Sequence, residues 1–324
     1  MDITVIVAAY NSGKTIARTL DAILRQKTSA EYEILIGDDC SKDDTVDICR
    51  RYELEYPDKI RIIARPENLG ILGNYFDCVR QARGRYIADC AADDFWIDEN
   101  KLQRQFEILE AEPDVSIVLT EWQHFDENTA ETSSHEGAIV TRRTDYNSAS
   151  IIPDILTHKL QFHLCTALYR KKTVTDMMAR HPRLMTDPDF SCEDQQILLT
   201  MATKGTIVLL PEVTLNYSVG HESISHSVDY KKKFEYSIKA LAQSKVLSDY
   251  FCPGDKSVSE YYRKCANHIA AMALRSLSAD CYRRLLAFES TTGIYPGIKG
   301  KIYINIMRCR PIWLLAAYLL NHRK

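Results

Sequence analysis

Three features are missing from this sequence of 324 residues, and each absence argues against a class of protein. The ten cysteines contain no C-x-x-C pair and no regular spacing, which favours reduced thiols over a disulfide framework or a zinc site. The longest apolar run near the C-terminus, Ile312–Leu320, is too short to span a bilayer. The chain opens Met1-Asp2-Ile3-Thr4, without the basic start of a secretory signal. We therefore expect a cytoplasmic protein.

Charge is distributed unevenly along the chain. Residues 1–230 hold 24 Lys and Arg against 38 Asp and Glu, a net charge of -14. Residues 231–324 hold 17 against 6, a net charge of +11. A basic tail on an acidic body favours an anionic partner, either nucleic acid or an anionic membrane face. We place the boundary at Tyr230, where the sequence changes to helices with basic faces.

The first hundred residues alternate between strand-length apolar runs and helical segments. Strands are predicted at Ile3–Ala9, Tyr32–Gly37, Lys59–Ala64 and Tyr86–Ala92. This alternation is typical of an α/β protein with a parallel sheet flanked by helices. Three of the strands end in polar or acidic pairs, which are Tyr10-Asn11, Asp38-Asp39 and Asp93-Asp94. The carboxyl ends of parallel strands share one edge of the sheet, so we expect these pairs to meet in one crevice.

Asp93 and Asp94 lie in the stretch GRYIADCAADDFW, residues 84–96. Adjacent carboxylates repel each other and lose hydration when buried, unless a positive charge lies between them. A divalent metal that also holds a phosphate supplies that charge, because oxygen ligands suit Mg²⁺ and Mn²⁺. The alternative is a solvated turn in which one acid caps the next helix. The convergence of three polar strand ends favours a metal–nucleotide site.

Four motifs in order resemble the inverting, metal-dependent nucleotide-sugar glycosyltransferases of family 2. They are VIVAAYN (5–11), EILIGDDCSKDDT (33–45), GRYIADCAADDFW (84–96) and SCEDQQILLTMATKG (191–205). The resemblance implies the GT-A fold, an α/β architecture with a Rossmann-like, mostly parallel central sheet flanked by helices. We expect a catalytic domain at 1–229, with the nucleotide side at 1–100 and the acceptor side at 101–229. A basic helical region would follow at 230–324.

The resemblance also implies which residues hold the donor, a nucleotide-sugar that we expect to carry UDP. Tyr10 would lie beside the nucleotide base, and Asp39 would accept a hydrogen bond from it. Asp93 and Asp94 would bind Mn²⁺ or Mg²⁺ and so neutralise the leaving diphosphate. The alternatives are simple packing of Tyr10 and a solvated turn around Arg65 and Asn68. The expected nucleotide contacts are Ala8, Tyr10, Asn11, Asp39, Arg65, Asn68 and Asp93.

Asp194 and its neighbour Glu193 form the expected catalytic pair. By resemblance, Asp194 is the base that removes the proton from the acceptor hydroxyl, which implies direct displacement with inversion. Glu193 would contact the acceptor or flank the base. From the sequence alone, both acids could instead stabilise the first turn of a helix predicted at 192–204, whose dipole favours negative charge there.

One position departs from the family pattern. Relatives usually carry an acid two residues before Asp93, and this chain has Ala91 there. The metal site then depends on Asp93 and Asp94, and weaker metal binding or a further ligand would follow. The resemblance suggests His221, in the segment YSVGHES, as that ligand. A histidine near an apolar strand, such as His163, is more often packed than bound to a ligand.

The segment 302–320 combines apolar residues with Trp313 and Tyr318, between basic residues that include Arg308. This pattern suits a helix in a membrane interface, as in an enzyme that extends a lipid-linked glycan at the inner face of the membrane. The alternatives are docking on the protein core or on a second copy of the chain. The aromatic residues resemble a membrane helix more than a stacking platform, so we expect no nucleic-acid partner.

We therefore expect an enzyme that transfers a hexose or N-acetylhexosamine to a saccharide acceptor of a cell-surface glycan. Two alternatives stay open. A sugar nucleotidyltransferase would carry a glycine-rich phosphate loop after the first strand, whereas AAYNSGKTIART (8–19) has one glycine. In a non-catalytic nucleotide- or glycan-binding relative, Ala91 would mark decay of the metal site.

Overall fold

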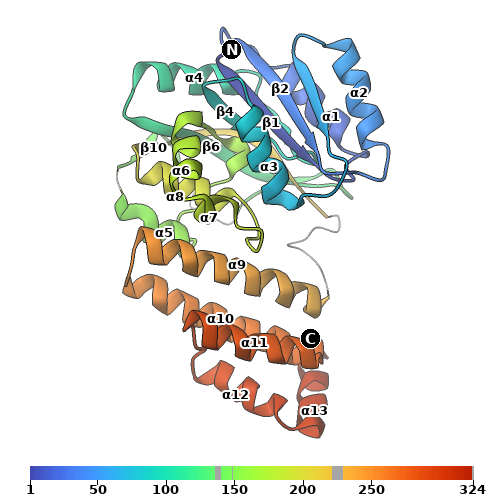
Figure 1. Ribbon diagram of the computed structural model, residues 1–324, viewed down its shortest axis with the longest axis vertical. Helices are drawn as coiled ribbons and strands as arrows, with labels where there is room; N and C mark the ends of the chain where they lie inside the picture. Colours follow the sequence, from blue (N-terminus) through green and yellow to red (C-terminus); the bar gives the residue numbers. More distant parts are fainter. Residues whose placement is uncertain (136–139, 148, 221–228, 323–324) are drawn as a thin grey trace. The chain divides into compact units, whose positions relative to one another are not determined.

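The structure is a computed structural model that describes residues 1–135, 140–147, 149–220 and 229–322 (Figure 1). The chain forms two compact units, one of Met1–Pro188 with Cys192–His221 and the other of Asp189–Ser191 with Glu222–Lys324. Within the described residues, the first unit holds a ten-stranded sheet flanked by helices, and the second is helical. The predicted α/β class, with a central sheet and a C-terminal helical region, is confirmed.

The N-terminal half of the sheet is parallel. Its strands lie in the order β3 (Ile60–Ala64), β2 (Tyr32–Asp38), β1 (Ile3–Ala9) and β4 (Tyr86–Asp89). The connecting helices are α1 (Ile16–Leu24), α2 (Thr45–Glu55) and α3 (Gly70–Gln81). Strands β1 and β2 are buried on both faces, which explains why they are continuous apolar runs in the sequence. Their parallel direction brings the ends of β1, β2 and β4 to one edge.

The other half of the sheet is mixed. Strand β9 (Leu168–Arg170) lies antiparallel between β4 and β6 (Val115–Asp126), and β10 (Thr206–Val219) runs parallel to β6. The short strands are β5 (Phe95–Trp96), β7 (Thr132–Ser134) and β8 (Thr144–Tyr146). Strand β10 continues past Pro211 to Val219, because register shifts around the proline let it keep pairing with β6.

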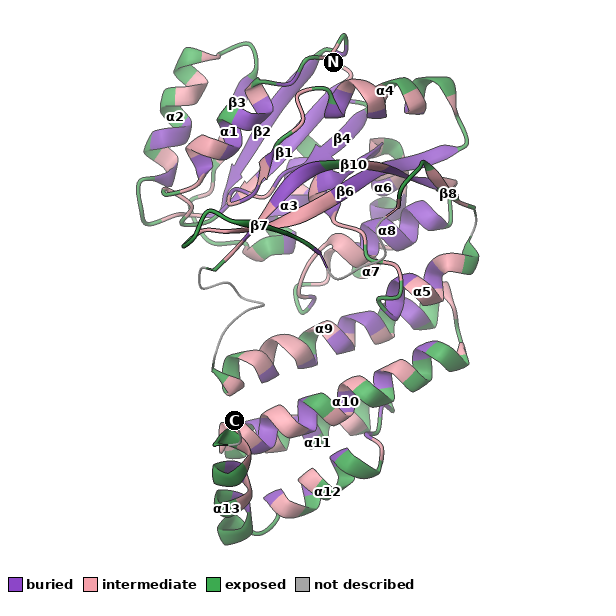
Figure 2. Cartoon of the chain, turned by 180° about the vertical axis from the view of Figure 1, so that it is seen from behind, coloured by how far each residue is buried: buried purple, intermediate pink, exposed green. Residues whose placement is uncertain are grey.

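Among the described residues, this unit also contains further helices and two 3₁₀ turns. They are α4 (Lys101–Ala111), η1 (Ala149–Ile151), α5 (Ile152–Leu156), η2 (Leu164–Thr166), α6 (Lys171–Arg180), α7 (Pro182–Thr186) and α8 (Asp194–Ala202). Figure 2 shows β1 and β2 buried along nearly their whole length, whereas β6 is buried in its first half and half-buried in its second. On α1, Ile16, Leu20 and Ile23 recur at helical spacing and are fully buried, so they form the core-facing side of the helix.

The second unit contains five helices among the described residues. They are α9 (Tyr230–Phe251), α10 (Lys256–Ser276), α11 (Ala279–Thr292), α12 (Ile298–Met307) and α13 (Arg310–Asn321). Three of them begin at a capping side chain, because Asp229, Asp255 and Ser278 each accept a main-chain N–H of the first turn. Across the described part of the chain, no helix is long and apolar enough to cross a bilayer.

Candidate functional site

A pocket of about 220 Å³ opens at the carboxyl ends of β1 and β4. Loops of neighbouring strands meet at this edge of an α/β sheet, where ligands bind. The pocket gathers five of the predicted residues, which are Ala8, Tyr10, Asp39, Glu193 and Asp194. Asn11, Arg65, Asn68, Asp93 and Asp94 are not among the residues that line it. The remaining predicted residue, His221, lies outside the described residues.

The Tyr10 ring is half exposed at the pocket, with 52% of the residue accessible, so it is not buried in the core at the end of β1. Asn11 follows with a φ of 51°, a left-handed conformation that asparagine tolerates. The Asn11 N–H donates to Ser41 Oγ at 2.9 Å, and its side-chain oxygen accepts from the Lys42 N–H at 2.8 Å. Asn11 therefore ties the loop after β1 to the loop after β2 and sets the position of Tyr10.

Asp39 is buried, and its Oδ1 accepts the main-chain N–H of Leu69 at 2.7 Å. Asn68 donates from Nδ2 to the carbonyl oxygen of Asp39 at 3.1 Å. Arg65 is paired with Asp77 at 2.5 Å, and its side chain is only 10% exposed. Arg65 and Asn68 therefore stabilise the loops next to Asp39 without lining the pocket, whereas Asp39 itself lines it.

Two elements hold the turn that carries Asp93 and Asp94 after β4. From α1, Thr19 Oγ1 donates to the carbonyl oxygen of Asp94 at 2.6 Å, and Arg18 Nη2 donates to that of Asp93 at 3.0 Å. From β10, the Ser218 N–H donates to Asp94 Oδ1 at 2.9 Å, and the Ser218 hydroxyl donates to the Asp93 carbonyl at 2.7 Å. The turn is thus fixed before any ligand binds.

The two acids of the turn have different surroundings. Asp94 is 1% exposed, whereas Asp93 is half-buried. Burial, together with the charge of Asp93, raises the pKa of Asp94 well above its usual range. The Oδ2 atom of Asp94 is buried and has no hydrogen-bond partner within the described part of the chain. A buried carboxylate oxygen without a partner is unfavourable, and a cation would relieve it. The residues present therefore fit a divalent metal.

Glu193 and Asp194 lie at the start of α8, where Asp194 is the first helical residue. Burial raises the pKa of Asp194 to about 6, against the opposing effect of a hydrogen bond from Cys192. Burial and the neighbouring charge of Asp194 raise the pKa of Glu193 well above its usual range. A carboxylate with a pKa near 6 suits a general base at neutral pH. Both acids line the pocket, and Asp194 also lies in the first turn of α8, where the helix dipole favours negative charge.

A buried network around Asp89 is missing from the sequence-based prediction. The Tyr75 hydroxyl donates to Asp89 Oδ1 at 2.7 Å and lies 2.5 Å from the Tyr169 hydroxyl. Burial raises the pKa of Asp89 to about 7, although the hydrogen bond from Tyr75 opposes the shift. Asp89 and Tyr75 both line the pocket. The polar end of β4 was visible in the sequence, but its pairing with a tyrosine of α3 was not.

Arg18 is a second residue that the sequence did not single out. Its guanidinium lies 4.2 Å from the centre of the Phe95 ring and pairs with Glu127 at 2.5 Å. It also donates to Ser218 Oγ at 3.2 Å. This places a cation beside the Asp93–Asp94 turn. A basic residue on α1 was visible in the sequence, but these partners come from distant parts of the chain.

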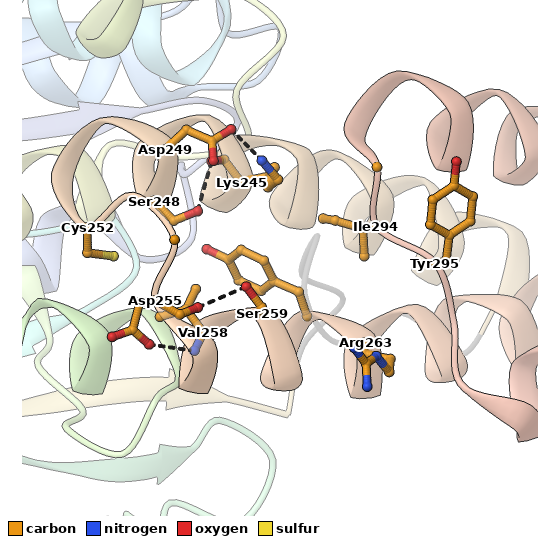
Figure 3. Close-up of a pocket in the computed structure, with 13 residues that line it drawn as sticks. Lys245, Ser248, Asp249, Cys252, Asp255, Val258, Ser259, Arg263, Ile294 and Tyr295 are labelled. Carbon is orange, nitrogen blue, oxygen red and sulfur yellow. Dashed lines mark hydrogen bonds and ion pairs between the residues drawn. The ribbon is translucent and has the colours of Figure 1, made fainter.

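A further pocket of about 340 Å³ lies in the helical unit between α9 and α10 (Figure 3). Its polar groups make contacts that stabilise the helices themselves, since Lys245 pairs with Asp249 within α9 and Asp255 accepts the Val258 N–H at the start of α10, at 3.0 Å. None of the residues predicted for a site lines it. The pocket at the sheet edge is therefore the candidate active site.

The sheet has a parallel half, whose loops form the pocket, and a mixed half. This is the arrangement of GT-A glycosyltransferases. Residues 4–176 match the model of Glycosyl transferase family 2, and the chain belongs to this family. The family predicted from the four motifs is confirmed.

Relatives match parts of the chain. The uncharacterised protein Rv1520 of Mycobacterium tuberculosis is 34% identical over 116 residues, which are 36% of this chain and 34% of that protein. The Escherichia coli UDP-Glc:alpha-D-GlcNAc-diphosphoundecaprenol beta-1,3-glucosyltransferase WfaP is 37% identical over 112 residues, which are 34% of this chain and 42% of that enzyme. The matched region thus spans less than half the length of these two relatives.

A solved structure shows the same fold over almost the whole chain. The mannosyltransferase PcManGT from Pyrobaculum calidifontis, in complex with GDP-Man and Mn²⁺, superposes with a TM-score of 0.56. The alignment covers 99% of this chain and 88% of that chain, at 16% identity. At this identity the comparison shows the GT-A fold alone.

Proposed function

We propose that this chain transfers a sugar from a nucleotide-sugar to a saccharide acceptor of a cell-surface glycan. The observation that carries the proposal is the single pocket that holds Tyr10, Asp39 and Asp194, which are far apart in the sequence. The UDP-Glc donor and diphosphoundecaprenol-linked acceptor in the name of WfaP favour a UDP-sugar and a lipid-linked acceptor here.

The donor would lie along the ends of β1 and β2. The exposed Tyr10 ring offers a face for the nucleotide base, and Asp39 accepts a hydrogen bond from the base. Ala8, with its small side chain in the pocket wall, leaves room for the nucleotide. Asn11, Arg65 and Asn68 position these groups through the contacts described above.

Asp93 and Asp94 would hold a divalent ion, and the Mn²⁺ in the PcManGT complex favours Mn²⁺ or Mg²⁺ for this chain. Such an ion, when bound, stabilises negative charge on a leaving diphosphate. The chain positions these carboxylates before an ion binds, because Ser218 and α1 hold the turn. Asp94 Oδ2 has no hydrogen-bond partner among the described residues. His221 is the third proposed ligand.

Asp194 would take the proton of the acceptor hydroxyl as that oxygen attacks the anomeric carbon. The raised pKa of Asp194 keeps the carboxylate basic enough for this step at neutral pH. A base in the acceptor half of the pocket, with the diphosphate leaving from the other side, gives direct displacement with inversion. Glu193 would contact the acceptor beside it.

Residues 1–229 would carry catalysis, and 230–324 would bring the enzyme to the inner membrane face. On α13, Leu315, Tyr318 and Leu319 are 61%, 60% and 55% exposed, while Trp313 and Ala317 are buried in the helical unit. Arg308 and Arg310 are exposed at the start of this helix. An apolar face beside cations suits an anionic bilayer surface. A second copy of the chain is the competing occupant of that face.

A panel of nucleotide-sugars with Mn²⁺, screened by thermal shift and by release of nucleoside diphosphate, tests the proposal. A true donor raises the melting temperature, because it binds only the folded chain, and it is slowly hydrolysed. A non-catalytic relative would be stabilised without releasing nucleoside diphosphate. Stabilisation by no member of the panel would contradict the proposed function.

A further inference from the structure

Asp94, His163 and Cys165 bring three different ligand types together. Each offers one ligand atom, a carboxylate oxygen, an imidazole nitrogen and a thiol sulfur, and these atoms all lie within 4.8 Å of one another. The turn after β4 supplies Asp94, and the 3₁₀ turn η2 with its capping residue supplies the other two. Sequence reasoning missed this cluster, because the cysteine spacing argued against a zinc site and a histidine such as His163 was expected to be packed.

The fold holds all three groups in position. Trp96 Nε1 donates to the carbonyl oxygen of Cys165 at 2.9 Å, and the Cys165 N–H donates to His163 Nδ1 at 3.3 Å. The His163 ring is half-buried, with its centre 4.8 Å from that of the Tyr217 ring. Asp94 is fixed through Oδ1, whereas its buried Oδ2 has no hydrogen-bond partner in the part of the chain described. These groups are therefore ordered before a ligand arrives.

Cys165 lines the pocket at the sheet edge, which gives an ion a route to its sulfur.

We propose that Asp94, His163 and Cys165 form a zinc site at the sheet edge. Sulfur, nitrogen and oxygen together suit Zn²⁺, whereas Mg²⁺ and Mn²⁺ prefer oxygen ligands alone. Tetrahedral zinc places neighbouring ligand atoms roughly 3.3–3.8 Å apart, so the three atoms need to approach by at most about 1.5 Å. Water takes the fourth position. On binding, a Zn–S bond forms, the Cys165 proton passes to the solvent, and no group is oxidised or reduced.

Zinc bound here occupies Asp94 and so withdraws it from the ion that would hold the donor diphosphate. This consequence depends on the proposed function. The zinc site itself does not depend on the proposed function. Because the test below uses no substrate, it can refute the zinc site without refuting the proposed function, and the reverse also holds.

Cobalt(II) titrated into the metal-free full chain reports directly on thiolate ligation. We expect a thiolate-to-cobalt charge-transfer band in the near ultraviolet that saturates at one equivalent and disappears when Zn²⁺ is added. The band should be lost in Cys165→Ser and in Cys165→Ala, and weakened in His163→Gln. It should persist in the control Cys192→Ser, which changes another half-buried cysteine of the same unit.

Alkylation of the wild-type chain provides a second measurement that needs no variant to fold. Zn²⁺ should protect Cys165 from iodoacetamide, as read by peptide mass spectrometry, whereas Mg²⁺ at the same concentration should not. Absence of the charge-transfer band, its survival in both Cys165 variants, or equal alkylation with and without Zn²⁺ would overturn the proposal.

Discussion

The main-chain N–H of Ser218 donates a hydrogen bond of 2.9 Å to one carboxylate oxygen of Asp94, which lies 124 positions earlier in the chain. This bond ties the end of β10 to the turn after β4. The two carboxylate oxygens of Asp94 therefore differ, because one accepts this structural hydrogen bond and the other is buried without a hydrogen-bond partner among the described residues. In the proposed metal site, the second oxygen would bind the cation.

Asp94→Ala should lower the free energy of unfolding by about 1–3 kcal/mol, because the buried Ser218 N–H loses its acceptor. Asp94→Asn keeps an acceptor oxygen and removes a buried charge, so it should not show this loss. Urea denaturation of both variants at pH 7, beside the exposed control Asp58→Asn, measures the difference. Equal destabilisation by Ala and Asn would refute the structural role of this oxygen.

The Asp94 turn also shows what the sequence could and could not predict. The apolar run of β4 and the acids that follow it predict the strand and a polar edge, because these depend on local periodicity. The predicted end at Ala92 is wrong, since β4 ends at Asp89. The difference in burial between Asp93 and Asp94 depends on contacts with Ser218 and α1. These contacts come from distant parts of the chain, so no local sequence pattern reveals them. Likewise, the position of Tyr10 was predictable, whereas the inward pairing of Arg65 with Asp77 is a tertiary contact.

Asp89 should make the stability of the protein depend on pH. Its pKa in the folded chain is about 7, above the ordinary 3.8, so the neutral form is favoured in the fold. The stabilisation is complete below about pH 4 and is lost as the pH rises through 7. The shift corresponds to at most about 4 kcal/mol. Asp89→Asn should therefore melt higher than wild type at pH 8 but not at pH 4.

The control for this measurement is Asp58→Asn, an exposed acid on the same unit. Melting temperatures of the three proteins are compared at both pH values without added metal. If Asp89→Asn and wild type lose stability in parallel between pH 4 and pH 8, Asp89 is not the titrating group.

Ala91→Asp should tighten the binding of Mn²⁺ several-fold, because Ala91 lines the pocket next to the Asp93–Asp94 turn and carboxylate charge sets affinity for hard cations. Ala91→Asn is the matched control, since it has nearly the same size without the charge. Calorimetric titration with Mn²⁺ in the presence of UDP gives both affinities. If the two variants bind Mn²⁺ with equal affinity, the missing carboxylate at position 91 does not limit metal binding.

Leu315→Ser with Leu319→Ser should weaken binding to anionic phospholipid vesicles at least about tenfold, because burial of each leucine is worth about 1.5–3 kcal/mol. The matched control is Leu54→Ser, an 81% exposed leucine on α2. Co-sedimentation with vesicles measures the loss. If vesicle binding is unchanged, and the wild type is a dimer that dissociates in the double variant, the exposed face of α13 binds a second copy of the chain instead of a membrane.

The most direct test of the account is the pH dependence of sugar transfer in wild type and Asp194→Asn. The donor is the nucleotide-sugar selected by thermal shift, and the acceptor is a diphosphate-lipid-linked saccharide. Asp176→Asn, at a half-exposed position on α6, serves as the control. Wild type and control should gain about tenfold in rate per pH unit below 6 and level off above it, as Asp194 loses its proton.

Asp194→Asn should bind the donor with unchanged affinity, transfer sugar about 10²–10⁴-fold more slowly, and lose the inflection near pH 6. A variant that keeps the wild-type rate and pH profile would contradict the assignment of Asp194 as the base, and with it the central claim about this pocket.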